Sequence, residues 1–396
     1  MGDPLFEDGI DLAVVLIVLL KVLVVFGFLL VSVLLMIWFE RKVISDMQSR
    51  VGPDRAGPWG ILQTLADGIK LFFKEDLMPE QADRRVFRLA PYLSAVPAFA
   101  SFAIIPMGGT ISIAGRETYL QLADPPVGIL FLLAMSSIAV YGVMLAGWSS
   151  GSKYPLLGAV RASAQMVSYE AAMSLAVAAA VLAAASLSTH DIVQSQATWS
   201  WNLWALGGVP FLIYMVAGTA EINRPPFDLV EAEQELVGGF HTEYSSIRFA
   251  LFFLAEFMNT ITIAAVAVTL FLGGPNGPAI GFLPDLWPVV WFFLKLVAFL
   301  FVYVWLRATL PRLRYDQLMD LGWKKLIPAA LYWLLLIAAL RAGRDQGWNQ
   351  GVVLGVSLAI GVLGWVILAG ALRVGQRETE DSAQGEEVLV RGEATS

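Results

Sequence analysis

The sequence predicts an all-α polytopic membrane protein with about nine transmembrane helices and an amphipathic helix on the membrane surface. Of its 396 residues, 57% are hydrophobic and only 15% are charged, whereas soluble domains contain about 45–50% apolar and about 25% charged residues. Apolar runs of roughly 20 residues, the length that crosses a bilayer as a helix, recur along the chain. These observations favour one helical membrane domain.

The apolar runs define the predicted spans and the connections between them. We expect residues 1–373 to form a single transmembrane domain, with cytoplasmic loops at about 40–88 and 221–246. Residues 374–396 are polar and acidic, which is typical of a disordered tail. The predicted spans are 11–39, 88–107, 127–148, 160–185, 202–220, 247–272, 287–310, 326–341 and 351–372.

The distribution of Lys and Arg predicts the orientation. Alternate connections, the first loop above all, are rich in these residues, and the opposite side holds only Arg116, Arg341 and Arg344. Because basic loops remain in the cytoplasm, we expect the N-terminus outside and the C-terminus in the cytoplasm. The acidic start MGDPLFEDGID does not resemble a cleavable secretory signal, so the first run is expected to be a retained anchor.

Composition also excludes several classes of function. A formal net charge of −7 argues against a nucleic-acid partner. The chain has no cysteine and two histidines, which excludes disulfides, iron–sulfur clusters and thiolate zinc sites and leaves no pair of histidines for a haem along one helix. No glycine-rich phosphate-binding loop is present. Any electron carriers are therefore expected on other chains, and no permanently held cofactor or metal is expected here.

The first loop contains a candidate surface helix. Gly-Pro pairs at residues 52–53 and 57–58 predict turns. In residues 59–74, apolar side chains then alternate with Gln63, Asp67, Lys70 and Lys74, as in a helix lying in the membrane surface. One interpretation is a simple lipid anchor. The other is a helix that covers an opening through which a lipid-soluble molecule enters from the side, out of the bilayer.

The fourth predicted span contains the motif RASAQMVSYE. Arg161 and Glu170 stand nine residues apart in it, about 13 Å along a helix, so they are too distant to pair. Gln165 and Tyr169 share one helix face and could bind a chain of water molecules. Glu170 lies deep in the span, where it would be either a proton carrier or a structural carboxylate bound to a neighbouring helix.

The segment 221–256 concentrates acids between two apolar runs. Pro225-Pro226 interrupts the helix before it, and Glu231 and Glu235 share one helical face while Glu233 points elsewhere. Carboxylates this close disfavour full ionisation, so the cluster should hold a shared proton near neutral pH. Apolar residues interleave the acids, which favours a segment packed into protein over a solvated loop. The acidic spacing is too wide for a hard-cation loop.

Four long motifs resemble the family of H subunits of NADH-quinone oxidoreductase, the membrane subunit at the heel of respiratory complex I, equivalent to mitochondrial NADH dehydrogenase subunit 1. The resemblance covers about residues 11–345. Thr64 departs from it, since the family commonly has proline there, and the ninth span and tail lie outside the shared core. The motifs are ERKVISDMQSRVGPDRAGPWGILQTLADGIKLFFKE, RASAQMVSYE, EINRPPFDLVEAEQELVGGFHTEYSSIRFALFFLAEF and RATLPRLRYDQLMDLGWKKLIP.

The resemblance implies a substrate, partners and a location. Quinone, either ubiquinone or menaquinone, would enter from the bilayer under the surface helix, and NADH, flavin and iron–sulfur clusters would be on partner subunits. The partners implied are the hydrophilic-arm subunits that carry the terminal cluster, and the small and antiporter-like membrane subunits. The expected location is a bacterial inner membrane.

Matching motifs also supply candidate site residues. A quinone passage is expected at Glu40, Arg41, Arg50, Asp67, Lys70, Phe227, Asp228, Phe240 and Tyr244. A proton pathway is expected at Glu170, Glu221, Asp228, Glu231, Glu233, Glu235 and Glu256. Supporting roles are expected for Glu75, Arg161, Arg312 and Arg314.

The hypothesis is a subunit that couples quinone reduction to proton translocation through buried carboxylates. Three alternatives share some of its features. They are an ion-translocating membrane hydrogenase subunit, a stand-alone proton-coupled transporter, and a scaffold whose acids dock other subunits.

Overall fold

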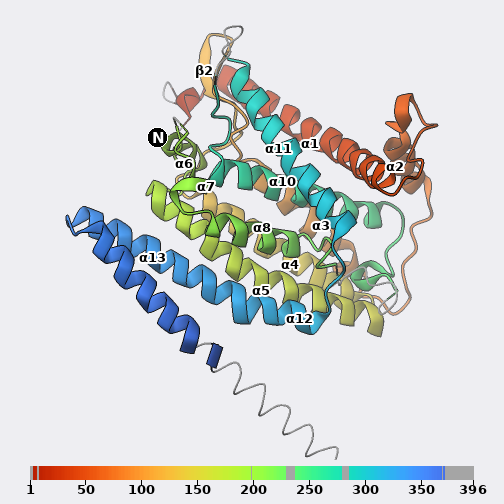
Figure 1. Cartoon of the computed structure of the whole chain (residues 1–396). Coiled ribbons are helices and arrows are strands. Elements are labelled where there is room, and N and C mark those ends of the chain that lie inside the picture. Colours follow the sequence, from red (N-terminus) through yellow and green to blue (C-terminus); the bar gives the residue numbers. More distant parts are fainter. Residues whose placement is uncertain are drawn as a thin grey trace, which may run out of the picture. The chain divides into compact units, whose positions relative to one another are not determined.

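The fold of the chain is almost entirely helical in the computed structural model, which describes residues 3–6, 9–197, 199–228, 237–278, 285–367 and 369–370 (Figure 1). Its only described sheet is the hairpin of β1 (Thr110–Ile113) and β2 (Arg116–Tyr119). The α-helices are α1 Leu12–Met47, α2 Gln63–Phe73, α3 Arg84–Phe102, α4 Gly128–Ser149, α5 Lys153–Ala184, α6 Thr189–Ser195, α7 Asn202–Ala205, α8 Val209–Glu221, α10 Ser246–Phe271, α11 Trp287–Thr309, α12 Tyr315–Asp320 and α13 Ile327–Asp345.

Each predicted span has a helix at its position. In the described part of the chain, seven helices are long and apolar enough to cross a membrane, with 315–345 counted as one and the last running over residues 350–367. The two remaining predicted spans correspond to α3, which contains two prolines, and to α8, which has 13 residues. The prediction of an all-α polytopic membrane protein is therefore confirmed. One difference is that α1 extends to Met47, past the predicted end at residue 39.

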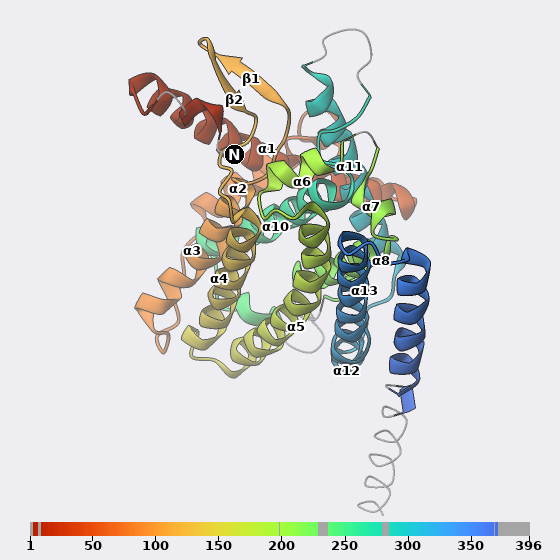
Figure 2. The same cartoon turned by 90° about the vertical axis from the view of Figure 1, so that its left-hand side faces the viewer.

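The chain divides into two compact units, Met1–Leu331 and Tyr332–Ser396. In the first unit α3, α4 and α5 lie side by side (Figure 2), and α10 packs against α3 and contacts α2. In the second unit the Tyr332 hydroxyl donates to the carbonyl of Ser357, which joins the two helices described there. The proposed single domain over residues 1–373 stays a prediction, and the acidic tail lies outside the described residues.

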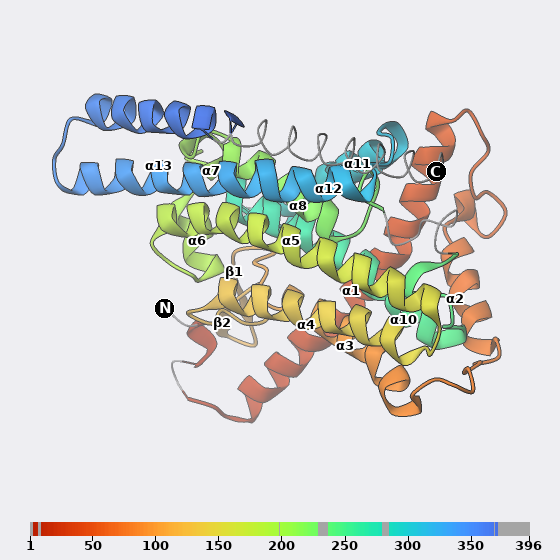
Figure 3. The same cartoon turned by 90° about the horizontal axis from the view of Figure 1, so that it is seen from below.

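The amphipathic surface helix is present as α2, which lies beside one end of α1 (Figure 3). The turn before it needs glycine, because Gly60 has a φ of +76° and a Cβ there would lie 2.4 Å from the backbone of Pro53. The indole of Trp38 donates to the carbonyl of Trp59 at 2.9 Å and ties this turn to α1. Large apolar side chains, among them Ile69 and Phe72, remain exposed, as an interfacial helix requires.

Two lysines within the spans are buried and bound by protein groups. Lys21 pairs with Asp3 at 3.0 Å, and the Thr118 hydroxyl donates to the same carboxylate. Lys295 donates to three backbone carbonyls that follow α10, with distances of 2.7–2.9 Å. Both ammonium groups therefore bind protein groups of neighbouring segments and do not extend to water at the membrane surface.

The segment 237–245 is held firmly against the bundle. Gly158 of α5 lets it approach, since a Cβ there would lie 2.8 Å from the backbone of Gly239. The ring of Tyr244 stacks on Phe87 with a centroid distance of 4.0 Å, and its hydroxyl donates to the Phe87 carbonyl at 3.1 Å. This packing fixes the position from which α10 begins.

Candidate functional site

An apolar cavity of about 340 Å³ lies between α1, α2 and α10. We call it the window cavity. At one edge Arg41 of α1 and Asp67 of α2 form an ion pair at 2.7 Å, which links the surface helix to α1. Its other lining residues are Leu30, Val33, Leu34, Ile37, Thr64, Gly68, Leu71, Phe72, Ile247, Ala250, Leu251, Phe253 and Leu254.

A second cavity, of about 480 Å³, adjoins the first and shares Ile37, Arg41 and Phe253 with it. We call it the arginine cavity, because Arg50, Arg224 and Arg307 also line it together with Glu40. The buried carboxylate of Glu40 is bound by Arg307 and lies 3.7 Å from Arg224. A buried carboxylate of this kind needs such cationic partners to remain charged.

Arg224 connects the arginine cavity to the interior. Its guanidinium is buried, pairs with Glu256 at 3.0 Å and lies over the ring of Phe257, with 4.3 Å to the ring centroid. The local sequence explains this position, because α8 ends at Glu221 and the chain turns sharply before the two prolines at 225–226. The amide of Gln165 then binds the carbonyls of residues 220 and 227, which fixes the turn on α5.

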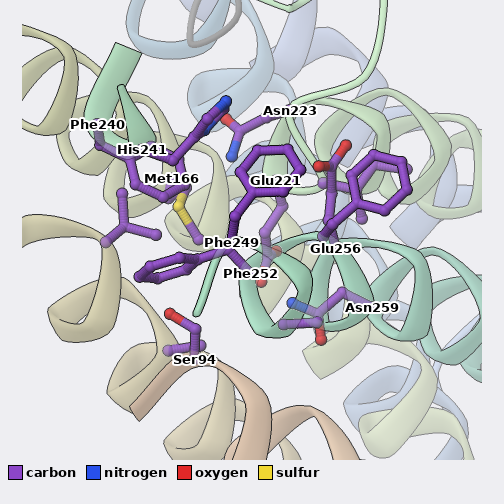
Figure 4. Close-up of a pocket in the computed structure, with 15 residues that line it drawn as sticks. Ser94, Met166, Glu221, Asn223, Phe240, His241, Phe249, Phe252, Glu256 and Asn259 are labelled. Carbon is purple, nitrogen blue, oxygen red and sulfur yellow. The ribbon is translucent and has the colours of Figure 1, made fainter. Parts of the chain in front are cut away.

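A third cavity, of about 70 Å³, is lined in part by Glu256, the partner of Arg224, and Figure 4 shows the residues around it. We call it the inner cavity. Its polar lining comes from Ser94, Glu221, Asn223, His241, Glu256 and Asn259. Of these, Ser94 Oγ, Glu221 Oε2 and Asn223 Oδ1 are buried and have no hydrogen-bond partner among the described residues. A cavity of this size has room for a few water molecules, and these three oxygens are the polar groups that would bind them.

Beyond the inner cavity, two neighbouring serines of α4 bind two carboxyl groups from different helices. The hydroxyl of Ser136 donates to Glu221 of α8, and that of Ser137 donates to Glu170 of α5 at 2.5 Å. The structure thus arranges a series of groups that we call the polar row: Glu40, Arg224, Glu256, the inner cavity, Glu221, Ser136, Ser137 and Glu170.

The remaining predicted site residues lie in several places. Asp228 pairs with Arg312 at 2.7 Å, and Phe227 packs against Tyr169. Phe240 lines the inner cavity, whereas Tyr244 is bound to Phe87 as described. Lys70 and Glu75 are exposed, Arg161 lies over the ring of Tyr315, and Arg314 pairs with Asp316. Glu231, Glu233 and Glu235 lie outside the described residues.

Several groups in the site were not predicted from the sequence. From the sequence, neither Arg224 nor Arg307 was assigned to the site, and there was no signal for Ser136, Ser137 or Phe253. Arg224 could have been found from its position between Glu221 and the proline pair. Gln165 and Tyr169, expected on a water chain, donate to backbone carbonyls instead.

His241 gives the site a testable pH dependence. Burial lowers the pKa of its imidazole from 6.5 to about 4. Between these values the unfolded chain binds a proton that the folded chain does not, so stability is complete above pH 6.5 and falls towards pH 4 by about 3 kcal/mol. We expect His241→Asn to remove this part of the acid sensitivity, measured as the change in melting temperature of the purified complex between pH 7 and 4.5. His241→Phe should do the same, and an unchanged pH dependence in both variants would contradict the assignment.

The fold and the site together define a class: a multi-pass helical membrane protein in which an apolar cavity beside an amphipathic helix adjoins buried, paired carboxylates. Comparison with known proteins identifies the member of that class. A family model described as NADH dehydrogenase matches residues 20–338. The H subunit of the NADH-quinone oxidoreductase of Frankia alni is 54% identical over 358 residues, which cover 87% of this chain and 79% of the relative. That of Frankia casuarinae is 53% identical over 379 residues, covering 93% and 82%.

The chain therefore belongs to the NADH dehydrogenase family, among the membrane subunits of NADH-quinone oxidoreductase. The resemblance predicted from the four motifs is confirmed. As a subunit of this enzyme complex, the chain works together with other subunits.

Proposed function

We propose that this chain forms the passage through which quinone enters and part of the quinone chamber, and that it couples quinone reduction to proton translocation through buried carboxylates. The observation that carries the proposal is the position of Phe253, which lines the window, arginine and inner cavities. An apolar cavity beside an interfacial helix suits a lipid-soluble molecule from the bilayer. Behind it, guanidinium groups suit a polar headgroup that gains negative charge.

The polar row supports the coupling part of the proposal. Reducing a quinone adds two electrons, delivered by partner subunits that carry iron–sulfur clusters, and requires two protons. Negative charge that develops near Arg224 competes with Glu40 and Glu256 for its guanidinium, and in a low dielectric this competition is strong. The carboxyl groups then exchange protons through the inner cavity towards Glu221 and Glu170. Glu231, Glu233 and Glu235 belong to the same proposed pathway.

The proposed setting follows from the charge distribution. The N-terminus faces the outside of a bacterial cell membrane, and the C-terminus with the loops at about 40–88 and 221–246 faces the cytoplasm. Those loops would contact the hydrophilic-arm subunits, while antiporter-like membrane subunits would receive protons from the polar row. Quinone, ubiquinone or menaquinone, is then a substrate of the assembled enzyme.

Filling the window cavity tests the passage directly. Gly68 of α2 lines it, and a Cβ at that position would meet no atom within 4 Å, so Gly68→Phe adds a bulky ring at the cavity wall on a backbone position that accepts a side chain. We expect kcat/KM for quinone to fall at least about tenfold. NADH oxidation by ferricyanide, which needs no quinone passage, should be retained in the same membranes.

A matched control is available on α1. Gly27 also has open space around its Cβ, and it lines none of the cavities described above. Gly27→Phe is therefore expected to keep wild-type quinone kinetics. Wild-type kcat/KM in Gly68→Phe, with the complex assembled, would overturn the proposed passage.

A further inference from the structure

Two consecutive serines at the start of α10 hold the end of the surface helix α2. The Ser246 hydroxyl lies 3.1 Å from the Leu71 carbonyl and 2.8 Å from the Lys74 carbonyl. The Ser245 hydroxyl donates to the Glu75 carbonyl at 3.2 Å and accepts from the backbone N–H of Leu77 at 2.8 Å. We call these two residues the serine clamp. They satisfy backbone groups that the end of α2 would otherwise leave without partners.

The backbone of the clamp is in an unusual conformation. Ser246 has a φ of +57°, in the left-handed region that residues other than glycine, asparagine and aspartate seldom adopt. Such a conformation persists only where surrounding contacts stabilise it, and it is most common at functional sites. Here it accompanies the contact of one hydroxyl with two carbonyls of a helix distant in sequence.

The clamp lies at one end of the window cavity. Leu71 and Phe72 line this part of the cavity from α2, and Ile247, the residue after the clamp, begins the wall from α10. Next to it, Arg248 pairs with Asp76 at 2.8 Å and strengthens the same junction. At the other side α2 is held to α1 by the solvent-exposed pair of Arg41 and Asp67, which is a weaker restraint.

We propose that Ser245 and Ser246 are positioning residues that set the spacing of α2 and α10 and so select quinones with long isoprenoid tails. The inference rests on the proposed passage. A long tail threads between the two helical walls and contacts both of them, so its affinity depends on their spacing. A short-tailed quinone makes few of these contacts and is insensitive to it.

The test uses the assembled enzyme in proteoliposomes and a variant chosen to fold. Ser245→Ala with Ser246→Gly removes both hydroxyls, while glycine accepts the positive φ without strain. The expected result is a KM at least about fivefold higher for a long-tailed isoprenoid quinone, since the loss of a single hydrogen bond already has that scale and the variant removes two hydroxyls. The kcat should change little. The KM for a short-tailed quinone should stay at the wild-type value.

Two further variants separate positioning from general damage. Ser246→Asn keeps a polar side chain, and asparagine tolerates a left-handed backbone. Its KM for the long-tailed quinone should therefore lie close to the wild-type value. Ser195→Ala removes a comparable hydroxyl, bound to Ile192 of its own helix at 2.8 Å and away from the window cavity, and should change neither KM. An equal loss with both quinones would overturn the proposal in favour of a merely structural role.

A second measurement reports on the spacing itself. The chain contains no cysteine, so Leu71→Cys gives it a single thiol in the wall of the window cavity. We expect a maleimide to label it faster in the clamp variant than in the intact clamp. A second outcome is that Gly68→Phe lowers quinone turnover while the clamp variant keeps wild-type kinetics and wild-type labelling. That combination would overturn the positioning role of the serine clamp and leave the proposed quinone passage intact. If Gly68→Phe has no effect, the passage itself fails.

Discussion

Replacing Arg224 with methionine is expected to abolish quinone reduction and to destabilise the chain by about 3–5 kcal/mol, the cost of breaking a buried ion pair. The guanidinium lies 3.0 Å from Glu256 and 3.7 Å from Glu40, and all three side chains are largely buried. Methionine has a similar length but no charge, so it leaves Glu256 without this partner. The measurements are NADH-quinone activity in membranes and the melting temperature of the purified complex.

The control for this variant is Arg314→Met. The Arg314 side chain is 78% exposed and pairs with the exposed Asp316, so its removal should change stability by less than about 0.5 kcal/mol. A double variant, Arg224→Met with Glu256→Gln, removes both charges of the pair and should regain part of the lost stability. Normal activity and a normal melting temperature in Arg224→Met would show that the ion pair of Arg224 and Glu256 contributes neither to quinone reduction nor to stability.

The membrane fold could be predicted from the sequence because its signal is local. Twenty apolar residues in succession identify a span wherever they occur, and α4 and α11 are close to their predicted bounds. The polar pattern of residues 59–74 likewise identifies α2. Bounds were less predictable where charged residues continue a helix, since α1 continues through Glu40 and Arg41 to Met47.

The site was predictable only in part, because its acidic residues can be recognised in the sequence but the residues that bind them cannot. Acids in apolar surroundings are costly, so Glu170, Glu221 and Glu256 could be recognised as unusual from sequence alone. Their partners could not be, since Ser136 is 85 residues from Glu221 along the chain. A serine in an apolar helix gives no sign of which helix will pack against it.

The arrangement of the cavities also bears on the alternatives to a quinone-linked subunit. Membership of the NADH dehydrogenase family argues against a stand-alone transporter. A scaffold whose acids only dock other subunits would have no reason to bury Glu40 and Glu221 inside the bundle, where ionisable groups are costly. Burial of paired carboxylates beside an apolar cavity supports the proposed charge coupling to a lipid-soluble substrate.

Glu221→Gln tests that coupling, and its expected effect is a loss of proton pumping of about 10²-fold, the scale on which a positioned proton donor contributes. Glutamine has the same shape and can still accept the hydrogen bond from Ser136, but its amide cannot release and take up a proton as a carboxyl group does. It therefore interrupts the polar row between the inner cavity and Glu170 without opening a hole. Proton uptake is measured with a pH-sensitive dye in proteoliposomes during NADH-quinone turnover.

The comparison that isolates the proton step is Glu117→Gln. Glu117 lies on β2 with an exposed side chain, so its replacement makes the same carboxyl-to-amide change outside the polar row and should leave pumping unchanged. Because Glu221→Gln is isosteric, the amount of assembled complex and its melting temperature should match those of the wild type. Undiminished pumping in a fully assembled Glu221→Gln complex would mean that protons do not pass through this carboxyl group, and that the buried acids respond only to charge at the quinone.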